Sequence, residues 1–434
     1  MKLVIFTPAK KVSSIGGCCA LVSQELVAQG HEVTIVRTEI EGLLKSETHH
    51  FGAPVLPWTR THQVTRVAED ADVLIYQIGD NYDFHKGGLE WLAALPGIVI
   101  LHDFFLGHLF RAWSDSNRAR GVEIVRAWYG EEMVKPFLTH SAPETFIEET
   151  KDRAPMIEWV CAMAHAVITH SSWGCERVVN SCAGPVRVVP LTYNKNLGSS
   201  LPGGMVYRPP GEKFAILTIG HVNANKRVES VIRALGTSPL LGGHSRYRLV
   251  GAIKPETATA LTRLAKENGV DLVVSGEVDD GALLRAIEES DVISCLRLPS
   301  LEAASGSLVE ALLNGKPTIV TDTGFYRDIP SSCVMKIRPD NEVADIRSAL
   351  EVLFSDPAQR EAMAAEGQRW ALQTFTTDNY VRELIGTVRD TMKTKPVLNA
   401  VMYFSRVLAH WSADYDATSN EAIMEPLTIF GSSS

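Results

Sequence analysis

Short apolar runs alternate with helical patterns along most of the chain, and the same alternation occurs twice. We expect strands in the first half at 2–6, 31–37, 72–77, 97–101, 166–169 and 186–189. In the second half we expect them at 214–219, 246–251, 272–276, 292–296 and 318–320. Strands that alternate with helices predict a parallel sheet covered by helices on both faces. The chain therefore favours two Rossmann-like α/β domains.

The domain boundaries follow from a change in composition. Residues 196–212 are rich in glycine and proline and show no periodicity, so we predict a linker there. An N-terminal domain would span 1–195 and a C-terminal domain 213–377. A helical segment and tail would occupy 378–434, with the helix packing back on the N-terminal domain or its aromatic side chains contacting a partner or a membrane surface.

Composition excludes several classes of protein. The 434 residues are 45% apolar and 21% charged, which is ordinary for globular domains. With 42 basic and 51 acidic residues, the chain lacks the broad positive field of a nucleic-acid binder. Seven cysteines without a C-x-x-C pair favour a reducing compartment, and no stretch is apolar enough for a signal or a membrane span. We expect a soluble, cytoplasmic protein, with a peripheral membrane contact and a homodimer left open.

The stretch from 297 to 330 carries the clearest chemical pattern. A loop with Glu302 leads through Ser305-Gly306-Ser307 into a short helix that contains Glu310. Free backbone N–H groups at a helix start, beside small residues, form a site for an anion such as a diphosphate. Seven residues separate the two glutamates, so one carboxylate can meet a sugar and the other a ribose. No G-x-G-x-x-G fingerprint is present.

A second feature supplies positive charge to this otherwise acidic chain. Lys226 and Arg227 follow an expected strand and begin a helix, where the helix dipole disfavours cations. That placement favours phosphate binding over a merely solvated pair. Arg297, at the end of another expected strand, would add a third cation.

The combination resembles a retaining glycosyltransferase of family four with the GT-B architecture, along nearly the whole chain. The segments that carry the resemblance are SIGGCCALVSQELVAQGHEVTIV, LHDFFLG, VITHSSW, TIGHVNANKR, SGEV, LLRAIEESDVISCLRLPS and the E-x(7)-E pair with GKPTIVTDTG. The resemblance implies two domains facing each other across a cleft. It also implies transfer of a sugar from a nucleotide-diphosphate sugar to a glycan, lipid-linked or small-molecule acceptor, with no metal and no other cofactor.

The resemblance also implies roles for particular residues. Glu302 and His102 would act at the reacting sugar, His102 by orienting or polarising the reacting groups. The donor-binding set would be Gly16, Gly17, His221, Lys226, Arg227, Gly276, Val278, Arg297, Ser305, Gly306, Ser307, Leu308 and Glu310. In that set His221 stands where the family often has arginine. The leaving phosphate would accept the acceptor proton on the same face, since no second carboxylate is placed as a nucleophile.

The acceptor site rests on weaker signals. Aromatic residues are frequent between 104 and 159, and Trp113, Trp128 and Tyr129 could stack on an acceptor sugar or simply fill a core. The sequence is also compatible with two alternative functions. The chain could be a catalytically silent nucleotide-sugar-binding subunit of a transferase complex, or a GT-B-type nucleotide-sugar epimerase or hydrolase.

Overall fold

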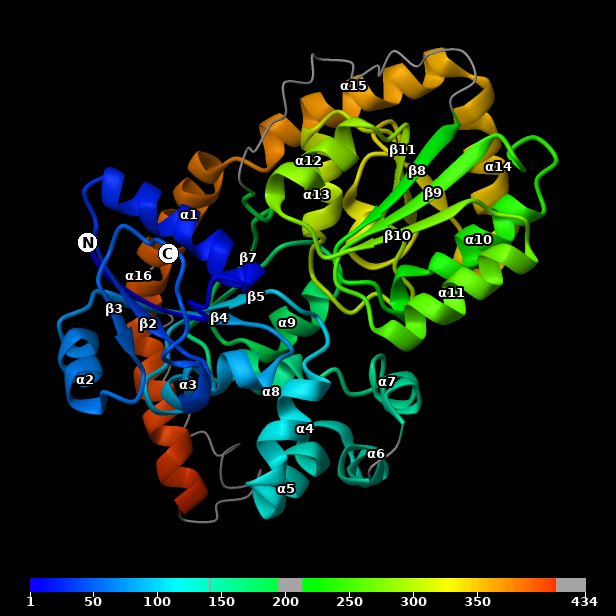
Figure 1. The fold of residues 1–434 in the computed structure, drawn as a ribbon. Coiled ribbons are helices and arrows are strands. Elements are labelled where there is room, and N and C mark those ends of the chain that lie inside the picture. The colour runs from blue at the N-terminus through cyan, green and yellow to red at the C-terminus, as the bar shows by residue number, and fades with distance from the viewer. Residues whose placement is uncertain (140–141, 194–212, 411–434) are drawn as a thin grey trace.

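The computed structural model describes residues 1–139, 142–193 and 213–410, and it shows two α/β domains, each built around one parallel sheet (Figure 1). The N-terminal sheet has the strand order β3-β2-β1-β4-β5-β6-β7, and the C-terminal sheet the order β10-β9-β8-β11-β12-β13. The N-terminal strands are β1 Lys2–Thr7, β2 Glu32–Arg37, β3 Val55–Pro57, β4 Val73–Ile78, β5 Ile98–Leu101, β6 Ala166–Thr169 and β7 Val186–Val188. The C-terminal strands are β8 Phe214–Ile219, β9 Ser245–Val250, β10 Leu272–Gly276, β11 Val292–Ser294, β12 Thr318–Thr321 and β13 Met335–Ile337. These findings confirm the expected fold class.

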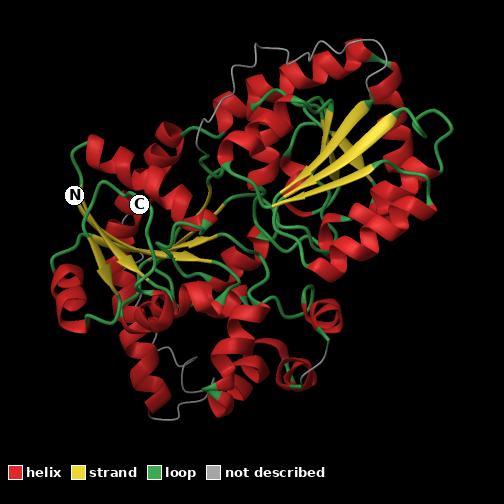
Figure 2. Ribbon diagram, viewed as in Figure 1, coloured by secondary structure: helices red, strands yellow, loops and turns green. Residues whose placement is uncertain are grey.

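Helices cover both faces of each sheet (Figure 2). In the N-terminal half they are α1 Ser14–Ala28, α2 Thr61–Glu69, α3 Tyr82–Ala94, α4 Gly107–Asp115, α5 Arg118–Tyr129, α6 Val134–Leu138, α7 Pro143–Thr150, α8 Ile157–Cys161 and α9 Cys175–Ser181. In the C-terminal half they are α10 Val228–Gly236, α11 Pro255–Glu267, α12 Asp280–Glu288, α13 Gly306–Leu313, α14 Glu342–Ser355, α15 Pro357–Thr374 and α16 Thr377–His410. Because both faces are covered, the central strands are buried on both sides and read as continuous apolar runs.

The last helix leaves the C-terminal domain and packs on the N-terminal one (Figure 1). Tyr380, Leu384 and Val388 of α16 share a buried core with β1 and α1. Arg187 of β7 forms ion pairs with Glu383 and Asp390 of the helix, at 3.3 and 2.5 Å. The expected return of the C-terminal helix is therefore confirmed. Among the described residues, no helix is both long and apolar enough to cross a bilayer.

Some details differ from the expected elements or fall outside the structure. The first helix begins at Ser14, because the hydroxyl of Ser13 caps it by accepting from the N–H of Gly16 at 3.1 Å. The short edge strands β3 and β13 were not expected, since three residues each give no readable period. The predicted linker, 196–212, lies outside the described residues.

The structure describes two of the four aromatic residues of the C-terminal segment. Tyr403 and Phe404 of α16 are 65% and 50% exposed, so packing on the domains does not cover them. Trp411 and Tyr415 lie outside the described residues.

Candidate active site

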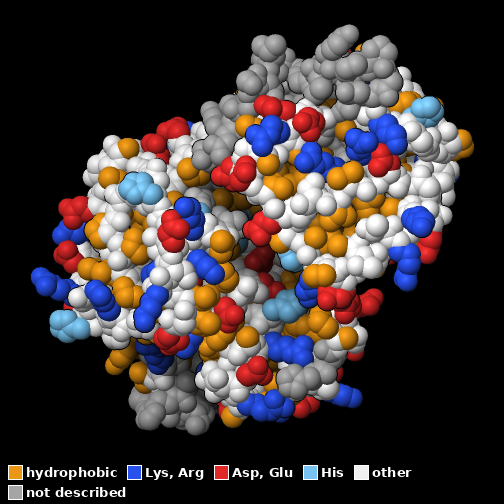
Figure 3. Space-filling model, in the orientation of Figure 1, with side chains coloured by type: hydrophobic (Ala, Val, Ile, Leu, Met, Phe, Trp, Pro, Cys, Tyr) orange, Lys and Arg blue, Asp and Glu red, His pale blue; other side chains and the backbone are white. Residues whose placement is uncertain are grey.

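The carboxyl ends of the two sheets face each other, and a cavity of about 660 Å³ lies between the domains. In open α/β sheets ligands bind beyond these strand ends, at the point where the strand order reverses. Here β1 and β4 flank that point in one sheet, and β8 and β11 flank it in the other. Acidic side chains are visible in the groove between the two halves of the molecule (Figure 3). The cavity walls include Asp80, Asp103, His108, Glu144, Glu148, Asn225, Arg227, Leu301 and Glu302.

Lys226 is a buried cation that lies in sequence between two residues of the cavity lining, Asn225 and Arg227. Its ammonium donates to the carbonyl of Ile219, to which the hydroxyl of Ser307 also donates at 3.4 Å. The α-carbon of Gly220 borders both groups, since a Cβ there would lie 2.9 Å from Lys226 Nζ and 3.3 Å from Ser307 Oγ. Burial, together with the charge of the nearby Arg297, lowers the pKa of Lys226 to about 7. Two donors thus converge on one glycine-lined point, as phosphate binding requires.

Arg227 is placed differently from its neighbour. Its guanidinium forms an ion pair with Glu342 of α14, where Nε donates to Oε1 at 2.8 Å and Nη2 to Oε2 at 2.7 Å. Glu342 also accepts from the hydroxyl of Ser230. Arg227 also lines the interdomain cavity, so its contact with the phosphates stays a prediction, but it has a carboxylate partner within its own domain.

Glu302 and Arg297 lie where the two domains touch. Arg297 Nε is 3.7 Å from Glu302 Oε1, and the Arg297 side chain is only 12% exposed. The loop around Glu302 pairs with the N-terminal domain through its backbone: the N–H of Phe104 donates to Leu301 O at 2.8 Å, and that of Ala303 to His102 O at 2.9 Å. These backbone bonds form an antiparallel bridge between Asp103 and Glu302.

The bridge places a second carboxyl group beside Glu302, contrary to the sequence analysis. Asp103 Oδ2 accepts from the N–H of Asp80 at 2.7 Å. Burial, with the charges of Asp80 and Glu302, raises the pKa of Asp103 well above its usual value. This shift favours the neutral form of Asp103, which is a poorer nucleophile than a carboxylate.

The start of α13 has the shape of an anion site. Ser305 is the N-cap, and its hydroxyl accepts from the N–H of Leu308 at 3.3 Å. Gly306 has a tyrosine ring as its neighbour, since a Cβ there would lie 3.3 Å from Tyr193. Ser305 and Leu308 are buried, whereas Gly306 and Ser307 are partly exposed.

Glu310 lies in the second turn of α13. Its Oε2 accepts from the hydroxyl of Tyr193 at 3.2 Å. Burial raises the pKa of Glu310, and the Tyr193 hydrogen bond opposes that rise. Of the residues expected near the nucleotide base, Gly276 borders open space and Val278 packs against the same core as Tyr193. His221 is exposed.

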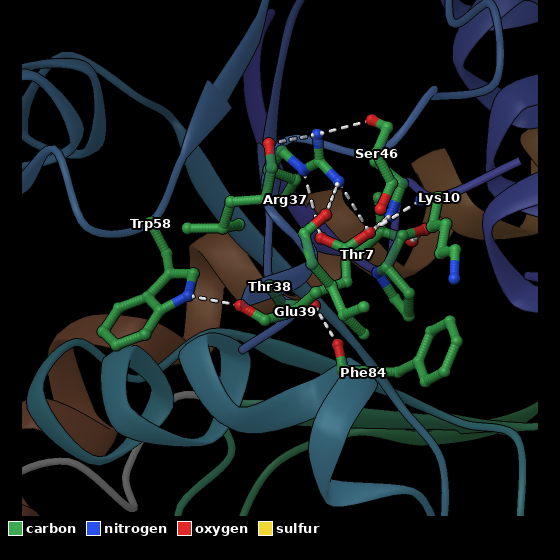
Figure 4. A network of polar contacts seen from close by, with 12 residues as sticks. Thr7, Lys10, Arg37, Thr38, Glu39, Ser46, Trp58 and Phe84 are labelled. Carbon is green, nitrogen blue, oxygen red and sulfur yellow. Dashed lines mark hydrogen bonds and ion pairs between the residues drawn. The ribbon is translucent and has the colours of Figure 1, made fainter. Parts of the chain in front are cut away.

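A buried polar network holds the turn after β1 in place (Figure 4). Glu39 accepts from the backbone N–H groups of Ala9 and Lys10, at 2.8 and 2.6 Å, and Arg37 Nε lies 3.2 Å from its other oxygen. This network holds the loop that leads into α1. Gly16 approaches that loop closely, since a Cβ there would lie 2.3 Å from the carbonyl oxygen of Pro8, whereas a Cβ at Gly17 would meet only the side chain of His49.

Both ring nitrogens of His102 face other residues of the N-terminal domain. Its Nε2 lies 2.5 Å from Gln77 Oε1 and its Nδ1 lies 3.3 Å from His170 Nε2. His170 in turn contacts the carbonyl of Val189 through Nδ1 at 3.0 Å. Burial, with His170 and His85 nearby, lowers the pKa of His102 well below its usual value. The expected contact of its ring with reacting groups is not supported, because both nitrogens already face protein atoms.

The proposed acceptor aromatics do not meet the interdomain cavity. Trp113 and Trp128 line a separate pocket of about 660 Å³ together with Trp159, Glu90 and other residues of α3, α5 and α8. Tyr129 donates its hydroxyl proton to Glu158 instead. Sequence spacing grouped these rings correctly on one helical insertion but could not say which side of it faces the other domain.

Sequence reasoning missed several polar residues of the cavity wall, among them Asp80, Asp103 and His108. A signal existed for the two aspartates, since Asp80 follows β4, which adjoins the reversal point, and Asp103 follows the next strand, β5. Within the part of the chain that the structure describes, no group of three or more His, Cys, Asp or Glu side chains is arranged to hold a metal ion.

Comparison with known proteins places this geometry in context. Residues 206–370 match the family model described as "Glycosyl transferases group 1". No curated protein matches the sequence significantly. Sucrose-phosphate synthase from Thermosynechococcus elongatus is similar in structure, with a TM-score of 0.63 and 14% identity over 90% of this chain and 98% of that one.

Two other solved structures are similar over most of their length. HepE from Anabaena, in complex with UDP, has a TM-score of 0.62 at 14% identity and covers 90% of this chain and 100% of its own. WaaG, a glycosyltransferase involved in lipopolysaccharide biosynthesis, has a TM-score of 0.56 at 13% identity, covering 88% and 98%. These likenesses establish the GT-B fold.

Proposed function

We propose that the protein is a retaining, metal-independent glycosyltransferase of family four that moves a sugar from a nucleotide-diphosphate sugar to a hydroxyl of a glycan, lipid-linked or small-molecule acceptor. The observation that carries the proposal is the convergence of Lys226, Ser307 and the start of α13 at one point, with Arg297 and Glu302 beside it. This convergence lies within the segment that matches the glycosyl transferase model.

The roles of the chain's residues follow from their positions. Lys226, the Ser307 hydroxyl and the first N–H groups of α13 would hold the diphosphate and stabilise charge as it leaves. Glu302, beside Arg297, would contact the donor sugar, and Glu310 the ribose. Burial raises the pKa of the neighbouring Asp103 and so favours its neutral form, which disfavours attack on the sugar by this group. Same-face substitution, with the leaving phosphate accepting the proton, fits this arrangement better than a covalent intermediate does.

A solved neighbour supports the choice of donor. The HepE structures contain UDP, UDP-glucose, or UDP with glucose. We propose a uridine diphosphate sugar as the first donor to test.

The test is turnover. Purified protein is incubated with UDP-, GDP-, ADP- and dTDP-sugars, each with and without a panel of sugar, glycan and lipid-linked acceptors, and the anomeric configuration of any product is determined by NMR. Transfer with retention supports the proposal. Products formed from donor alone at comparable rates would favour the epimerase or hydrolase alternative. Nucleotide-sugar binding without turnover would favour the silent subunit.

A further inference from the structure

A histidine on the N-terminal wall of the cavity has no part in the roles assigned above. His108 lies in the first turn of α4 and lines the interdomain cavity with Asp80, Asp103 and Glu302. The rings of Phe105 and Phe146 contact the imidazole in T-shaped geometry, with their centroids 5.4 and 5.5 Å from the centroid of His108. Its side chain is nevertheless 41% exposed. The imidazole is therefore fixed in direction while remaining accessible from the cavity.

Asp80 determines which nitrogen of this ring carries the proton. Asp80 Oδ2 lies 2.5 Å from His108 Nδ1, and Asp80 Oδ1 accepts from the N–H of Leu109 at 2.8 Å. Burial raises the pKa of Asp80, whereas the hydrogen bond and charge of His108 oppose that rise. While Asp80 is ionised it only accepts hydrogen bonds, so a neutral imidazole beside it carries its proton on Nδ1 and keeps the lone pair on Nε2. Nowhere in the described ranges does a protein group form a hydrogen bond to Nε2.

Asp80 also has a structural role, which must be separated from this one. Helix α4 has no side-chain cap of its own, and the carboxylate of Asp80 supplies that cap from the loop after β4. Capping accounts for Asp80 at this position. It does not require a histidine at 108, because the cap bonds reach the backbone.

The histidine lies at one end of a continuous polar row along the wall. Asp80 donates its N–H to Asp103, and Asp103 forms the backbone bridge with Glu302, the residue assigned to the donor sugar. Glu144 and Glu148 of α7 line the same cavity. Lys151 and Arg227 line it as well, so a molecule that reaches His108 lies next to the donor sugar among side chains of both charges.

Resting on the proposed function, we propose that His108, held by Asp80, binds the acceptor: Nε2 accepts a hydrogen bond from a hydroxyl of a sugar or polyol. The bond would fix which acceptor hydroxyl faces the donor. His108 is then an acceptor-binding residue, and Asp80 is a positioning residue that acts through it.

The test uses the donor and acceptor with which the wild-type protein shows transfer, and UDP as the probe of the donor site. His108→Ala should raise the KM for the acceptor about tenfold or more, while UDP affinity stays within twofold of wild type. His108→Gln keeps an acceptor oxygen and should recover part of the loss. Asp80→Asn keeps the helix cap, but its amide donates to Nδ1 and shifts the ring proton to Nε2. It should therefore lose acceptor affinity in the same way, without loss of helix content.

Controls separate this inference from the function on which it rests. His62→Ala, on the exposed face of α2, should match wild type in every measurement. If wild type transfers sugar and His108→Ala has an unchanged acceptor KM, the inference is overturned and the function stands. If wild type transfers nothing in the full screen, the proposed function itself is wrong and the inference falls with it. Should Asp80→Asn fail to fold, the comparison of His108→Ala with His108→Gln still decides the matter.

Discussion

The hydroxyl of Tyr193 donates to Oε2 of Glu310 at 3.2 Å, so the carboxylate assigned to the ribose already has a partner from the segment that follows the N-terminal sheet. The Tyr193 ring also lies against Gly306 at the start of α13. A ribose hydroxyl that binds Oε2 of Glu310 would compete with this hydrogen bond.

Tyr193→Phe should consequently tighten UDP binding. Removing one competing hydrogen bond is worth about 1 kcal/mol, or roughly fivefold in affinity. Isothermal titration with UDP measures the change, and Tyr403→Phe on the exposed part of α16 is the matched control. Weaker binding in Tyr193→Phe would show that the tyrosine holds Glu310 ready for the nucleotide rather than competing for it.

The two glutamates of the E-x(7)-E pair should separate kinetically. Glu310→Gln should act mainly on the donor KM, because a ribose contact is the same before and during reaction. Glu302→Gln should act mainly on kcat, by about ten- to a hundredfold, since its contact with the reacting sugar strengthens in the transition state. Steady-state kinetics on both variants, with circular dichroism to confirm folding, provide the measurement. A folded Glu302→Gln variant with wild-type kcat would mean that the active centre is assigned wrongly.

UDP affinity should depend on pH through Lys226. Because burial lowers the pKa of Lys226 to about 7, the free protein loses this charge as the pH rises through 7. A bound diphosphate favours the ammonium, so binding takes up a proton above pH 7. Affinity should therefore be greatest below pH 7 and fall by up to about tenfold per pH unit above it. Titration calorimetry between pH 6.5 and 9 tests this, and Lys226→Met should bind more weakly with a flatter profile.

Stability of the free protein should change with pH in the opposite direction. The folded pKa of Lys226 lies below its ordinary value of 10.5, so the unfolded chain binds more protons between about pH 7 and 10.5. The Lys226 contribution to the free energy of unfolding therefore rises with pH over that window. Denaturant unfolding of wild type and Lys226→Met at pH 7 and 9 should show a smaller pH-dependent gain in the variant.

Arg227 should matter for stability more than for phosphate binding. Its partner Glu342 is 7% exposed, and removing the guanidinium leaves that carboxylate buried without its cation. Arg227→Met should lower the free energy of unfolding by about 2 kcal/mol, a modest value because a third of the arginine is exposed. Urea denaturation measures the loss. If UDP affinity also falls tenfold in the folded variant, Arg227 reaches the phosphates after all.

The paired glycines of α1 should respond differently to alanine. At Gly16 a Cβ would lie 2.3 Å from a backbone oxygen, so Gly16→Ala must displace the loop or the helix and should cost about 2 kcal/mol or more. At Gly17 the nearest atoms belong to the side chain of His49, so Gly17→Ala should be close to neutral. Thermal unfolding of the two variants compares them directly. Equal losses would show that helix packing, not the approach to Pro8, selects glycine here.

The sequence alone was sufficient for the fold. Strands β8 and β10 occur with the expected bounds, because a buried parallel strand has a run of apolar residues that ends at a glycine or at a polar turn. The grouping of Lys226, Glu302 and Glu310 on one domain was also readable, since each follows a strand or begins a helix at a recognisable position. These are local signals, carried by neighbours in the chain.

The tertiary structure decided what each side chain faces. The sequence around Arg227 does not indicate that it pairs with Glu342, which lies 115 positions away. Neighbouring residues likewise do not indicate that Tyr193 contacts Glu310, or that Asp80 contacts His108. The same holds for Trp113 and Trp128, whose spacing places them on helices but not toward the cavity. The physical reason is that periodicity fixes which face of an element is buried, whereas the partner on that face depends on how separate elements pack.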